Sequence, residues 1–379
     1  MNVTSQEHKT MELKVQNLIK TDLNWRKTLE ELSITIKEDE SYLLLKYGIT
    51  ANFANPIVQE CRGLILNKYT LEVVCHSFDK FGNFGESYAP EIDWTTARCQ
   101  AKMDGSLIKV WHDKGQWRVS TNGTIDAYKA ELYQSDLVTD DCPYHTFGEL
   151  FDAARQAQLP SYDHLNPDCT YSFELCSKYN KVVCQYSEPT IYHIGTRNNK
   201  TNEESNPDIG VRKPTEYPLH SLQDCIEAAA HLSYNEEGYV VVDANWNRIK
   251  VKSPTYIAAH YMKNNGQVSL KGLLQYYRAG DLDEFVTYAP EYAPVVTKLY
   301  KLLNTFKEEL RTTMTESKYK AYPRKDFALA VKESGTQYPD YCFKWYDGIG
   351  YTPERYLEEL SFERFFRIIE ARWIETKNN

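Results

Sequence analysis

The chain has 379 residues, of which 42% are hydrophobic and 26% are charged, and its formal net charge at pH 7 is −9. The length favours two domains, and the composition is typical of a soluble globular protein without a membrane-spanning segment. The acidic balance argues against a protein that coats nucleic acid through charge alone, although it does not exclude a local basic groove.

The N-terminus and the cysteines indicate a reducing compartment. The first residues, MNVTSQEHKTMELK, lack the apolar core of a signal peptide, so we expect a cytoplasmic protein. The nine cysteines are scattered and form no CxxC pair, which argues against both a zinc site and a disulfide framework. We therefore expect free thiols that are mostly buried.

The predicted elements change in character along the chain. Residues 10–40 are expected to form a helix followed by a loop. From about 57 to 255 short strand-like runs dominate, and expected helices at 146–158 and 221–232 interrupt them, which predicts an α+β domain of antiparallel sheets. The strand-like runs are GLILN, VVCHSF, SLIKVW, WRVST, TYSFEL, KVVCQY, TIYHIG, GYVVVD and RIKVK.

After Ser253 and Pro254 the pattern becomes helical. Apolar residues recur at helical spacing in VVTKLYKLLNTFKEELR, and Thr352 with Pro353 has the pattern of an N-cap followed by the first helical position. We predict a first domain over residues 1–256 and an all-helical domain over residues 257–379.

The stretch AKMDGSLIKVW, residues 101–111, places Lys102 two residues before an Asp-Gly turn. From this local pattern alone, Lys102 is an exposed lysine beside a hairpin, because Asp-Gly before an alternating strand is a turn signal. The K-x-D-G tetrapeptide is too common by chance to identify a nucleophile, so the surrounding residues must decide.

A second pair of lysines lies in RIKVKS. Side chains alternate across a strand, so Lys250 and Lys252 share one face while Ile249 and Val251 share the other. Two ammonium groups about 7 Å apart repel each other unless an anion lies between them; the alternative is a solvated edge strand. Glu237 opens the paired strand and is expected to face the same space.

For three further charged residues the sequence allows both a structural and a functional interpretation. In TYSFELCS, Glu174 lies on the strand face opposite Phe173, where it either points at solvent or acts as a hydroxyl acceptor or metal ligand. Arg62, in ECRGLIL, and Lys80, in FDKFGNFGE, are either structural or bind phosphate, which suits both cations.

The order of these residues is more informative than any one of them. An Arg, a Lys, a K-x-D-G, a strand Glu, an EG and a K-x-K follow one another over about 190 residues. This order resembles the nucleotidyltransferase superfamily of polynucleotide ligases and mRNA capping enzymes. Within it the chain is similar to the bacteriophage T4-type RNA ligase 1 family, through ECRG, FDKFGNFGE and KVVCQYSEPTIYHIGTR over residues 42–260, and more weakly at YPRKDFALAVKE.

The resemblance implies a nucleotidyltransferase (ATP-grasp-like ligase) domain of antiparallel sheets with flanking helices, followed by an all-α C-terminal domain that sets RNA specificity. It implies an ATP-dependent RNA ligase that joins 5′-phosphate and 3′-hydroxyl ends of single-stranded RNA, in RNA or tRNA repair. Lys102 would form a covalent lysine–AMP and pass the AMP to the RNA. Lys250 and Lys252 would favour its neutral form and neutralise charge on the α-phosphate.

The same resemblance assigns further site residues. The implied nucleotide-binding residues are Tyr47, Arg62, Lys80, Lys102, Glu174, Glu237, Lys250 and Lys252. Glu237 and Asp283 would hold Mg²⁺, which Mn²⁺ can replace, and Tyr256 would join the catalytic lysines as a residue needed for ligation. Arg197, after TIYHIGT, has a structural and a nucleotide-contacting reading, and Asn122 stands where relatives carry a basic residue.

The implied partners are single-stranded RNA ends, among them a nicked tRNA anticodon loop, and an upstream polynucleotide kinase-phosphatase. We expect a monomer without a membrane partner, in the host cytoplasm if the source is viral. The alternatives are a DNA ligase, an mRNA capping guanylyltransferase and a non-catalytic RNA-binding relative. A DNA ligase or capping enzyme would continue with a small strand-rich domain, for which the sequence has no pattern.

Overall fold

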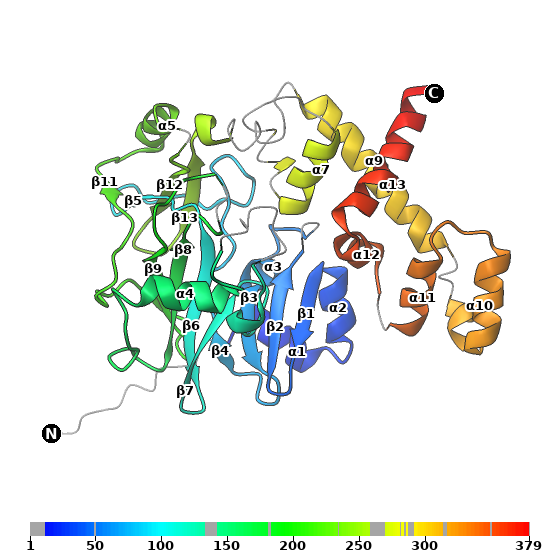
Figure 1. Cartoon of the computed structure of the whole chain (residues 1–379), viewed down its shortest axis with the longest axis horizontal. Coiled ribbons are helices and arrows are strands. Elements are labelled where there is room, and N and C mark those ends of the chain that lie inside the picture. Colours follow the sequence, from blue (N-terminus) through cyan, green and yellow to red (C-terminus); the bar gives the residue numbers. More distant parts are fainter. Residues whose placement is uncertain are drawn as a thin grey trace. The chain divides into compact units, whose positions relative to one another are not determined.

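The computed structural model comprises two compact units (Figure 1). The first is Met1–Lys20, Ile36–Tyr47 and Phe53–Asn265, and the second is Thr21–Thr35, Gly48–Asn52 and Gly266–Asn379. A segment near the N-terminus thus belongs to the unit that holds the C-terminal helices. The structure describes residues 12–48, 51–132, 142–180, 183–233, 235–257, 270–280, 282–283, 286, 292–313, 317–348 and 351–378.

The first unit is built on three sheets, which confirms the predicted α+β class. One has the order β1-β2-β3-β4, with β1 (Ile34–Glu38), β2 (Tyr42–Tyr47), β3 (Arg62–Asn67) and β4 (Val73–Cys75). The second has the order β10-β9-β8-β6-β7, with β6 (Ser106–Asp113), β7 (Gln116–Thr121), β8 (Cys169–Cys176), β9 (Thr190–Asn198) and β10 (Glu204–Ser205). The third has the order β11-β5-β12-β13, with β5 (Arg98–Ala101), β11 (Glu216–Tyr217), β12 (Gly238–Val242) and β13 (Arg248–Lys252).

Helices cover the outer faces of two of these sheets. In α4 (Phe147–Arg155), Thr146 and Glu149 form a capping box, and Leu150 and Phe151 are fully buried in the core that β6 and β8 supply. Figure 1 shows α4 crossing the strands of the five-stranded sheet. α5 (Leu222–Ala230) packs in the same way on β12 and β13. The unit also contains α1 (Lys14–Thr21), α3 (Pro56–Glu60) and the 3-10 helix η1 (Ala127–Lys129).

The predicted alternation along the strands is confirmed. Ile249 and Val251 are buried in the core under α5, whereas Lys250 and Lys252 lie on the other face and are partly exposed. All nine cysteines are free, and eight of them are buried, as expected.

Two local expectations are wrong, and one of the two interpretations of the Asp-Gly turn is excluded. In KVVCQY, the described residues 183–186 form no strand. The loop expected before residue 40 contains β1. The Asp-Gly turn after Lys102 is not a hairpin, because β5 before it and β6 after it belong to different sheets.

The second unit is helical in its described part. Its helices are α2 (Trp25–Glu31), α7 (Leu270–Ala279), α9 (Ala293–Thr312), α10 (Arg324–Glu333), α11 (Pro339–Asp347), α12 (Pro353–Glu359) and α13 (Phe362–Asn378), with the 3-10 helix η3 (Ser317–Ala321). The Thr352 hydroxyl accepts a hydrogen bond from the amide of Arg355, which confirms the predicted N-cap. Among the described residues, no helix combines the length and the apolarity that crossing a membrane requires.

A buried charge network joins two sheets of the first unit. Glu204 on β10 accepts from Arg197 on β9 and from Arg248 on β13, each at 2.5 Å. Arg197 also donates to Asp79 at 3.1 Å and contacts His76. The network therefore anchors the start of the FDKFGNFGE segment, and it places Arg197 in a structural role.

Replacement of Glu204 by alanine is expected to lower the free energy of unfolding by about 3–5 kcal/mol, because two buried guanidinium groups lose their shared carboxylate. Urea denaturation measures this loss. Glu216→Ala is the matched control: Glu216 pairs with Arg98 through a side chain that is 51% exposed, so its loss should cost less than about 1 kcal/mol. Equal losses in the two variants would contradict the structural role of the network.

Candidate active site

A buried carboxylate shared by two lysines lies at the end of β5. Lys102 Nζ donates to Glu237 Oε2 at 2.6 Å, and Lys252 Nζ lies 3.7 Å from Glu237 Oε1. The Glu237 side chain is 6% exposed. The structure thus brings together three of the residues that the sequence singled out.

Strand pairing explains this meeting. β12 pairs antiparallel with both β5 and β13, and Gly238 stands opposite Lys252 in the register. The amide of Lys102 donates to the Gly238 carbonyl at 2.8 Å. Gly238 has φ +136°, and a Cβ there would lie 2.3 Å from the Val251 carbonyl oxygen, so the Glu-Gly pair requires its glycine.

Glu174 joins the same site from β8. Its Oε1 accepts a hydrogen bond at 3.1 Å from the amide of Gly105, the glycine of the Asp-Gly turn. Burial raises the pKa of Glu174 to about 7; Lys102 opposes this rise, and Glu237 adds to it. A Cβ on Gly105 would lie 2.3 Å from the Leu175 carbonyl oxygen. The backbone of this turn therefore packs directly against the backbone of β8.

The pKa of Lys102 departs from expectation. Burial lowers it most and Lys252 lowers it further, but the charge and hydrogen bond of Glu237, together with the charge of Glu174, outweigh both, so the pKa of Lys102 lies above its ordinary value. The sequence predicted the opposite direction, because it showed the neighbouring lysines but not the hydrogen bond to Glu237. In this arrangement Lys102 carries its proton.

Asp104, which the sequence suggested only as a turn residue, organises the loop around Lys102. Its Oδ2 accepts from the amides of Val183 and Cys184 at 2.8 and 2.7 Å, and its Oδ1 accepts from Tyr256 Oη at 3.0 Å. Because these amides bond to a carboxylate, residues 183–186 do not pair as a strand. The one sequence signal for this role was the position of Asp104 inside the K-x-D-G motif.

The FDKFGNFGE segment runs beside β13 and presents a ring to two cations. Lys250 donates from its amide to the Gly82 carbonyl, and Phe84 donates to the Lys250 carbonyl, both at 3.0 Å. Lys250 Nζ lies 5.2 Å from the centroid of the Phe81 ring, and Arg62 Cζ lies 6.0 Å from it. Lys250 and Arg62 therefore flank one aromatic side chain.

Tyr47 and Lys80 form the neighbouring part of the site. Lys80 Nζ lies 4.8 Å from the Phe53 ring centroid and 5.9 Å from that of Tyr47, and the two rings contact each other edge to face. Arg62 Nη1 is buried and has no hydrogen-bond partner among the described residues. A buried donor without an acceptor fits an anionic ligand.

The two residues predicted to hold metal lie in different units. Glu237 is in the first, while Asp283 is in the second, where its exposed carboxylate accepts from Tyr300 Oη at 2.8 Å. In the part of the chain that the structure describes, no three His, Cys, Asp or Glu side chains gather into a metal site. Magnesium typically binds one or two carboxylates and completes its coordination shell with phosphate oxygens and water. The carboxylates of Glu237 and Glu174 fit such an ion. Metal binding by Asp283 stays a prediction.

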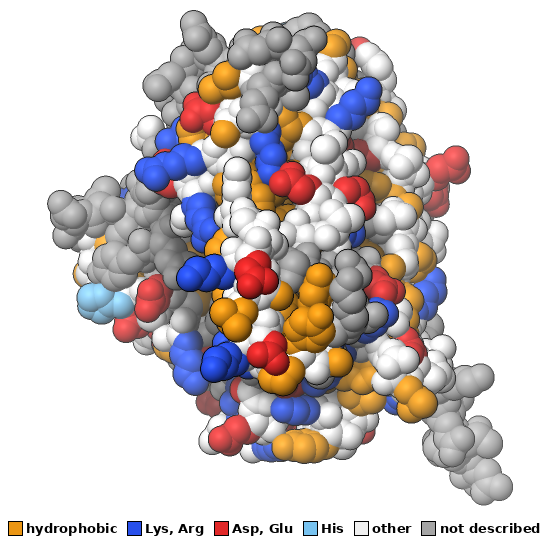
Figure 2. All heavy atoms as spheres, turned by 90° about the vertical axis from the view of Figure 1, so that its right-hand side faces the viewer, with side chains coloured by type: hydrophobic (Ala, Val, Ile, Leu, Met, Phe, Trp, Pro, Cys, Tyr) orange, Lys and Arg blue, Asp and Glu red, His pale blue; other side chains and the backbone are white. Residues whose placement is uncertain are grey.

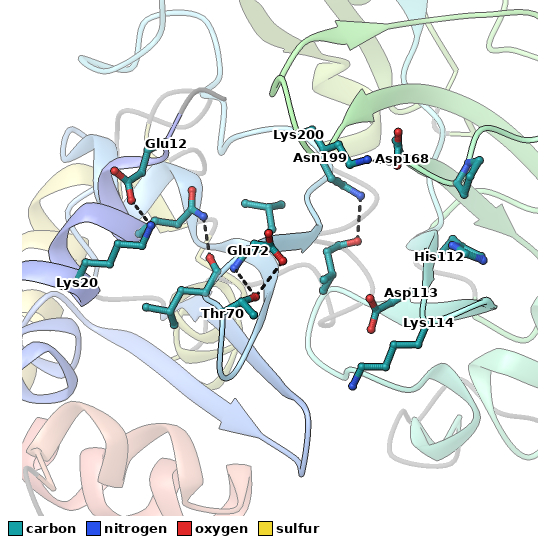
Figure 3. Close-up of a pocket in the computed structure, with 15 residues that line it drawn as sticks. Glu12, Lys20, Thr70, Glu72, His112, Asp113, Lys114, Asp168, Asn199 and Lys200 are labelled. Carbon is teal, nitrogen blue, oxygen red and sulfur yellow. Dashed lines mark hydrogen bonds and ion pairs between the residues drawn. The ribbon is translucent and has the colours of Figure 1, made fainter. Parts of the chain in front are cut away.

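A hollow of about 560 Å³ lies apart from these residues (Figure 3). Four of its charged side chains form ion pairs: Glu12 with Lys20 at 2.5 Å, and Asp168 with Lys200 at 2.8 Å. None of the predicted site residues lines it. We therefore place the candidate active site around Lys102.

The raised pKa of Glu174 predicts a pH dependence of stability. The folded protein keeps a proton that the unfolded chain releases above pH 4.5, so this group makes the free energy of unfolding fall as pH rises from 4.5 to about 7. Glu174→Gln stays neutral, so relative to the wild type it should gain about 2 kcal/mol between pH 5 and pH 8 in urea denaturation. Parallel pH profiles of the two proteins would contradict the buried carboxylate.

Removal of the Tyr256 hydroxyl should weaken the Asp104 cluster. Tyr256→Phe is expected to lower the free energy of unfolding by about 1–3 kcal/mol, because a buried carboxylate loses a hydrogen-bond donor. Tyr239→Phe is the matched control, since Tyr239 is equally buried and makes no hydrogen bond to a carboxylate among the described residues. Urea denaturation compares the two variants, and an equal effect would argue against the cluster.

The sequence is similar to proteins named as RNA ligases. A family model for the T4 type, described as RNA ligase, matches residues 60–256. A protein of Autographa californica nuclear polyhedrosis virus, assigned as a bifunctional polynucleotide kinase/RNA ligase, is 34% identical over 270 residues, which are 67% of this chain and 38% of that protein. An RNA ligase of Rhodothermus phage RM378 is 26% identical over 349 residues, which are 76% of this chain and 78% of that protein.

Among solved structures, an archaeal ATP-dependent RNA ligase shares 14% identity over 72% of this chain and 74% of its own, with a TM-score of 0.44. The match to this chain covers 38% of the length of the baculovirus relative and 78% of the length of the phage relative. Because the family model matches more than half of its residues, the chain belongs to the T4-type RNA ligase family.

Proposed function

We propose that this chain is an ATP-dependent RNA ligase that joins 5′-phosphate and 3′-hydroxyl ends of single-stranded RNA. The observation that carries the proposal is Lys102, held by Glu237 beside Lys252, in a chain that belongs to the RNA ligase family. A lysine suits the reaction because a phosphorus–nitrogen bond is stable enough to wait for RNA and is activated when its nitrogen is protonated.

In the first step the Lys102 nitrogen attacks the α-phosphorus of ATP. A bond forms between nitrogen and phosphorus, the bond to the β-phosphate oxygen breaks, and pyrophosphate leaves. Lys102 must first lose a proton, and Glu237, at 2.6 Å, is the acceptor in position. Burial raises the pKa of Glu237, which makes it a better acceptor than an exposed carboxylate.

Cations around Lys102 suit the charge that grows on the α-phosphate. Lys252 lies beside the nucleophile, and Lys250 and Arg62 flank the Phe81 ring. Fixed positive groups in a partly buried site lower the energy of such a transition state without reorganisation. A divalent metal ion, by expectation Mg²⁺ or Mn²⁺ held in part by Glu237, would supply further neutralisation of phosphate charge.

The other residues would bind the nucleoside of ATP. Tyr47 and Phe53 offer aromatic surface next to the Lys80 ammonium, and Glu174 can accept a ribose hydroxyl with the oxygen that Gly105 leaves free. In the second step the AMP passes from Lys102 to the RNA 5′-phosphate. In the third step a 3′-hydroxyl attacks that phosphate and AMP leaves, with Lys250 and Lys252 again facing the phosphate.

The RNA substrate and the partners are proposed on coarser grounds. We assign RNA recognition to the helical region, residues 257–379, and nicked tRNA anticodon loops as one substrate. On the face shown in Figure 2, the coloured basic and acidic side chains are interspersed with hydrophobic ones. The name of the baculovirus relative includes a polynucleotide kinase, which supports an upstream kinase-phosphatase that prepares the ends. We further propose a monomer that works in the host cytoplasm.

The alternatives are less well supported. A DNA ligase or capping guanylyltransferase would carry a small strand-rich domain after Lys252, whereas the described residues after it form helices. A non-catalytic RNA-binding relative would have no need for Lys102 and Glu237 to remain paired in a buried site.

The proposal is tested by covalent labelling with radioactive ATP or GTP. We expect ATP alone to label the protein and Lys102→Ala to abolish the label. Lys102→Ala should still seal pre-adenylylated RNA, because that step no longer needs the nucleophile, whereas Lys250→Ala should lose most of this activity. Lys129→Ala, which removes an exposed lysine of the same unit, serves as the control. Labelling of Lys102→Ala, or no circularisation of a 5′-phosphorylated RNA by the wild type with ATP and Mg²⁺, would refute the proposal.

A further inference from the structure

A fully buried lysine lies behind the candidate site. Lys109 on β6 is 0% exposed, and among the described residues no carboxylate pairs with it. Alternation along β6 places it on the same face as Trp111, which packs in a cluster with Leu44 and Ile65 of β2 and β3. Lys109 therefore occupies the layer between the five-stranded sheet and the sheet that contains β3.

The ammonium group of Lys109 binds one backbone carbonyl. Lys109 Nζ donates to the carbonyl oxygen of Gly63, the residue that follows Arg62 on β3. Gly63 has φ +70°, and a Cβ there would lie 2.9 Å from Lys109 Nζ and 2.6 Å from the carbonyl and side-chain oxygens of Asn122. This crowding keeps the position a glycine and fixes the course of the chain directly after Arg62.

Arg62 extends from this fixed point toward the candidate site. Its guanidinium carbon lies 4.7 Å from the Phe78 ring centroid and 6.0 Å from that of Phe81, and its buried Nη1 has no hydrogen-bond partner among the described residues. Arg62 also acts electrostatically on Lys109. Lys109 is fully buried and Arg62 partly buried, and neither has a carboxylate at salt-bridge distance in the described chain, although Glu174 feels the charge of Arg62. Such a pair of neighbouring cations favours binding of an anion on the solvent side of Arg62.

Burial of a lysine in an apolar layer costs several kcal/mol, which a methionine of similar size would avoid. Burial accordingly lowers the pKa of Lys109, and Arg62 lowers it further. Such a conflict between local burial and residue type is expected at functional sites rather than in purely structural cores.

We propose that Lys109 is a positioning residue for nucleotide phosphate: it holds the Gly63 carbonyl, and so fixes the direction in which Arg62 presents its guanidinium to the ligand. The inference rests on the proposed function only in naming ATP as that ligand. Lys109 itself touches no substrate, because it is buried between the sheets.

The test is calorimetric titration of the full chain with ATP. Lys109→Met is expected to weaken ATP binding about tenfold, the loss of one charge-assisted contact, while its thermal unfolding midpoint stays equal or rises because a buried charge is gone. A variant that unfolds earlier but binds ATP as the wild type does would show a structural lysine and overturn the inference.

A double-mutant cycle decides whether Lys109 acts through Arg62. Arg62→Ala should weaken ATP binding, and adding Lys109→Met to it should change the affinity less than twofold, since the group that Lys109 positions is already absent. Additive losses of affinity would overturn the inference.

Leu44→Ala is the matched control, because it removes apolar contacts from the same layer without touching Gly63. It should lower the unfolding midpoint and leave ATP affinity within twofold of the wild type; a tenfold loss there would mean that any loosening of the layer affects the site. Covalent labelling keeps the two proposals separate. If the wild type binds ATP but Lys102 does not become labelled, the proposed ligase function fails. The comparison of ATP affinities still decides whether Lys109 positions Arg62.

Discussion

The candidate active site depends on one buried carboxylate that serves two ammonium groups. Lys102 and Lys252 favour the ionised form of Glu237, which burial opposes, and the carboxylate in turn offsets the repulsion between the two lysines. Every other feature of the site is arranged around this triplet. Glu237 directly precedes β12, Lys102 directly follows β5 and Lys252 ends β13, so the central pairing of one sheet places all three.

Support for the triplet comes from outside that sheet. Glu174 on β8 binds the turn after Lys102 through Gly105, and Asp104 ties the same turn to Val183 and Tyr256. The ion pairs of Glu204 with Arg197 and Arg248 connect β10 to β9 and to β13. Lys102, the proposed nucleophile, thus lies on a short backbone link that is hydrogen-bonded on both sides, which limits the geometries that it can adopt.

Much of this arrangement was open to prediction, and the rest was not, for physical reasons. Alternation along a strand depends on sequence alone, so the common face of Lys250 and Lys252 was predicted correctly. The approach of Glu237 to Lys252 was also expected, because Glu237 opens the paired strand. The approach of Lys102 depends on the pairing of β5 with β12, and only the family resemblance suggested it. The sign of the Lys102 pKa shift depends on a distance of 2.6 Å, and the central position of Asp104 depends on amides about eighty residues away. Neither can be read from a local pattern. Lys109 was counted among the residues of an ordinary strand, because nothing in SLIKVW shows that both of its faces are covered.

The contacts that define the site join residues far apart along the chain. Lys102 and Glu237 are separated by 135 positions, and Asp104 and Tyr256 by 152. Contacts of such sequence separation form slowly during folding, because a long loop must close before they contribute stability. A chain whose helices and hairpins have formed still lacks the contact between Lys102 and Glu237. The proposed activity would therefore return, after dilution from denaturant, only when these long-range contacts have formed, later than the helical circular dichroism.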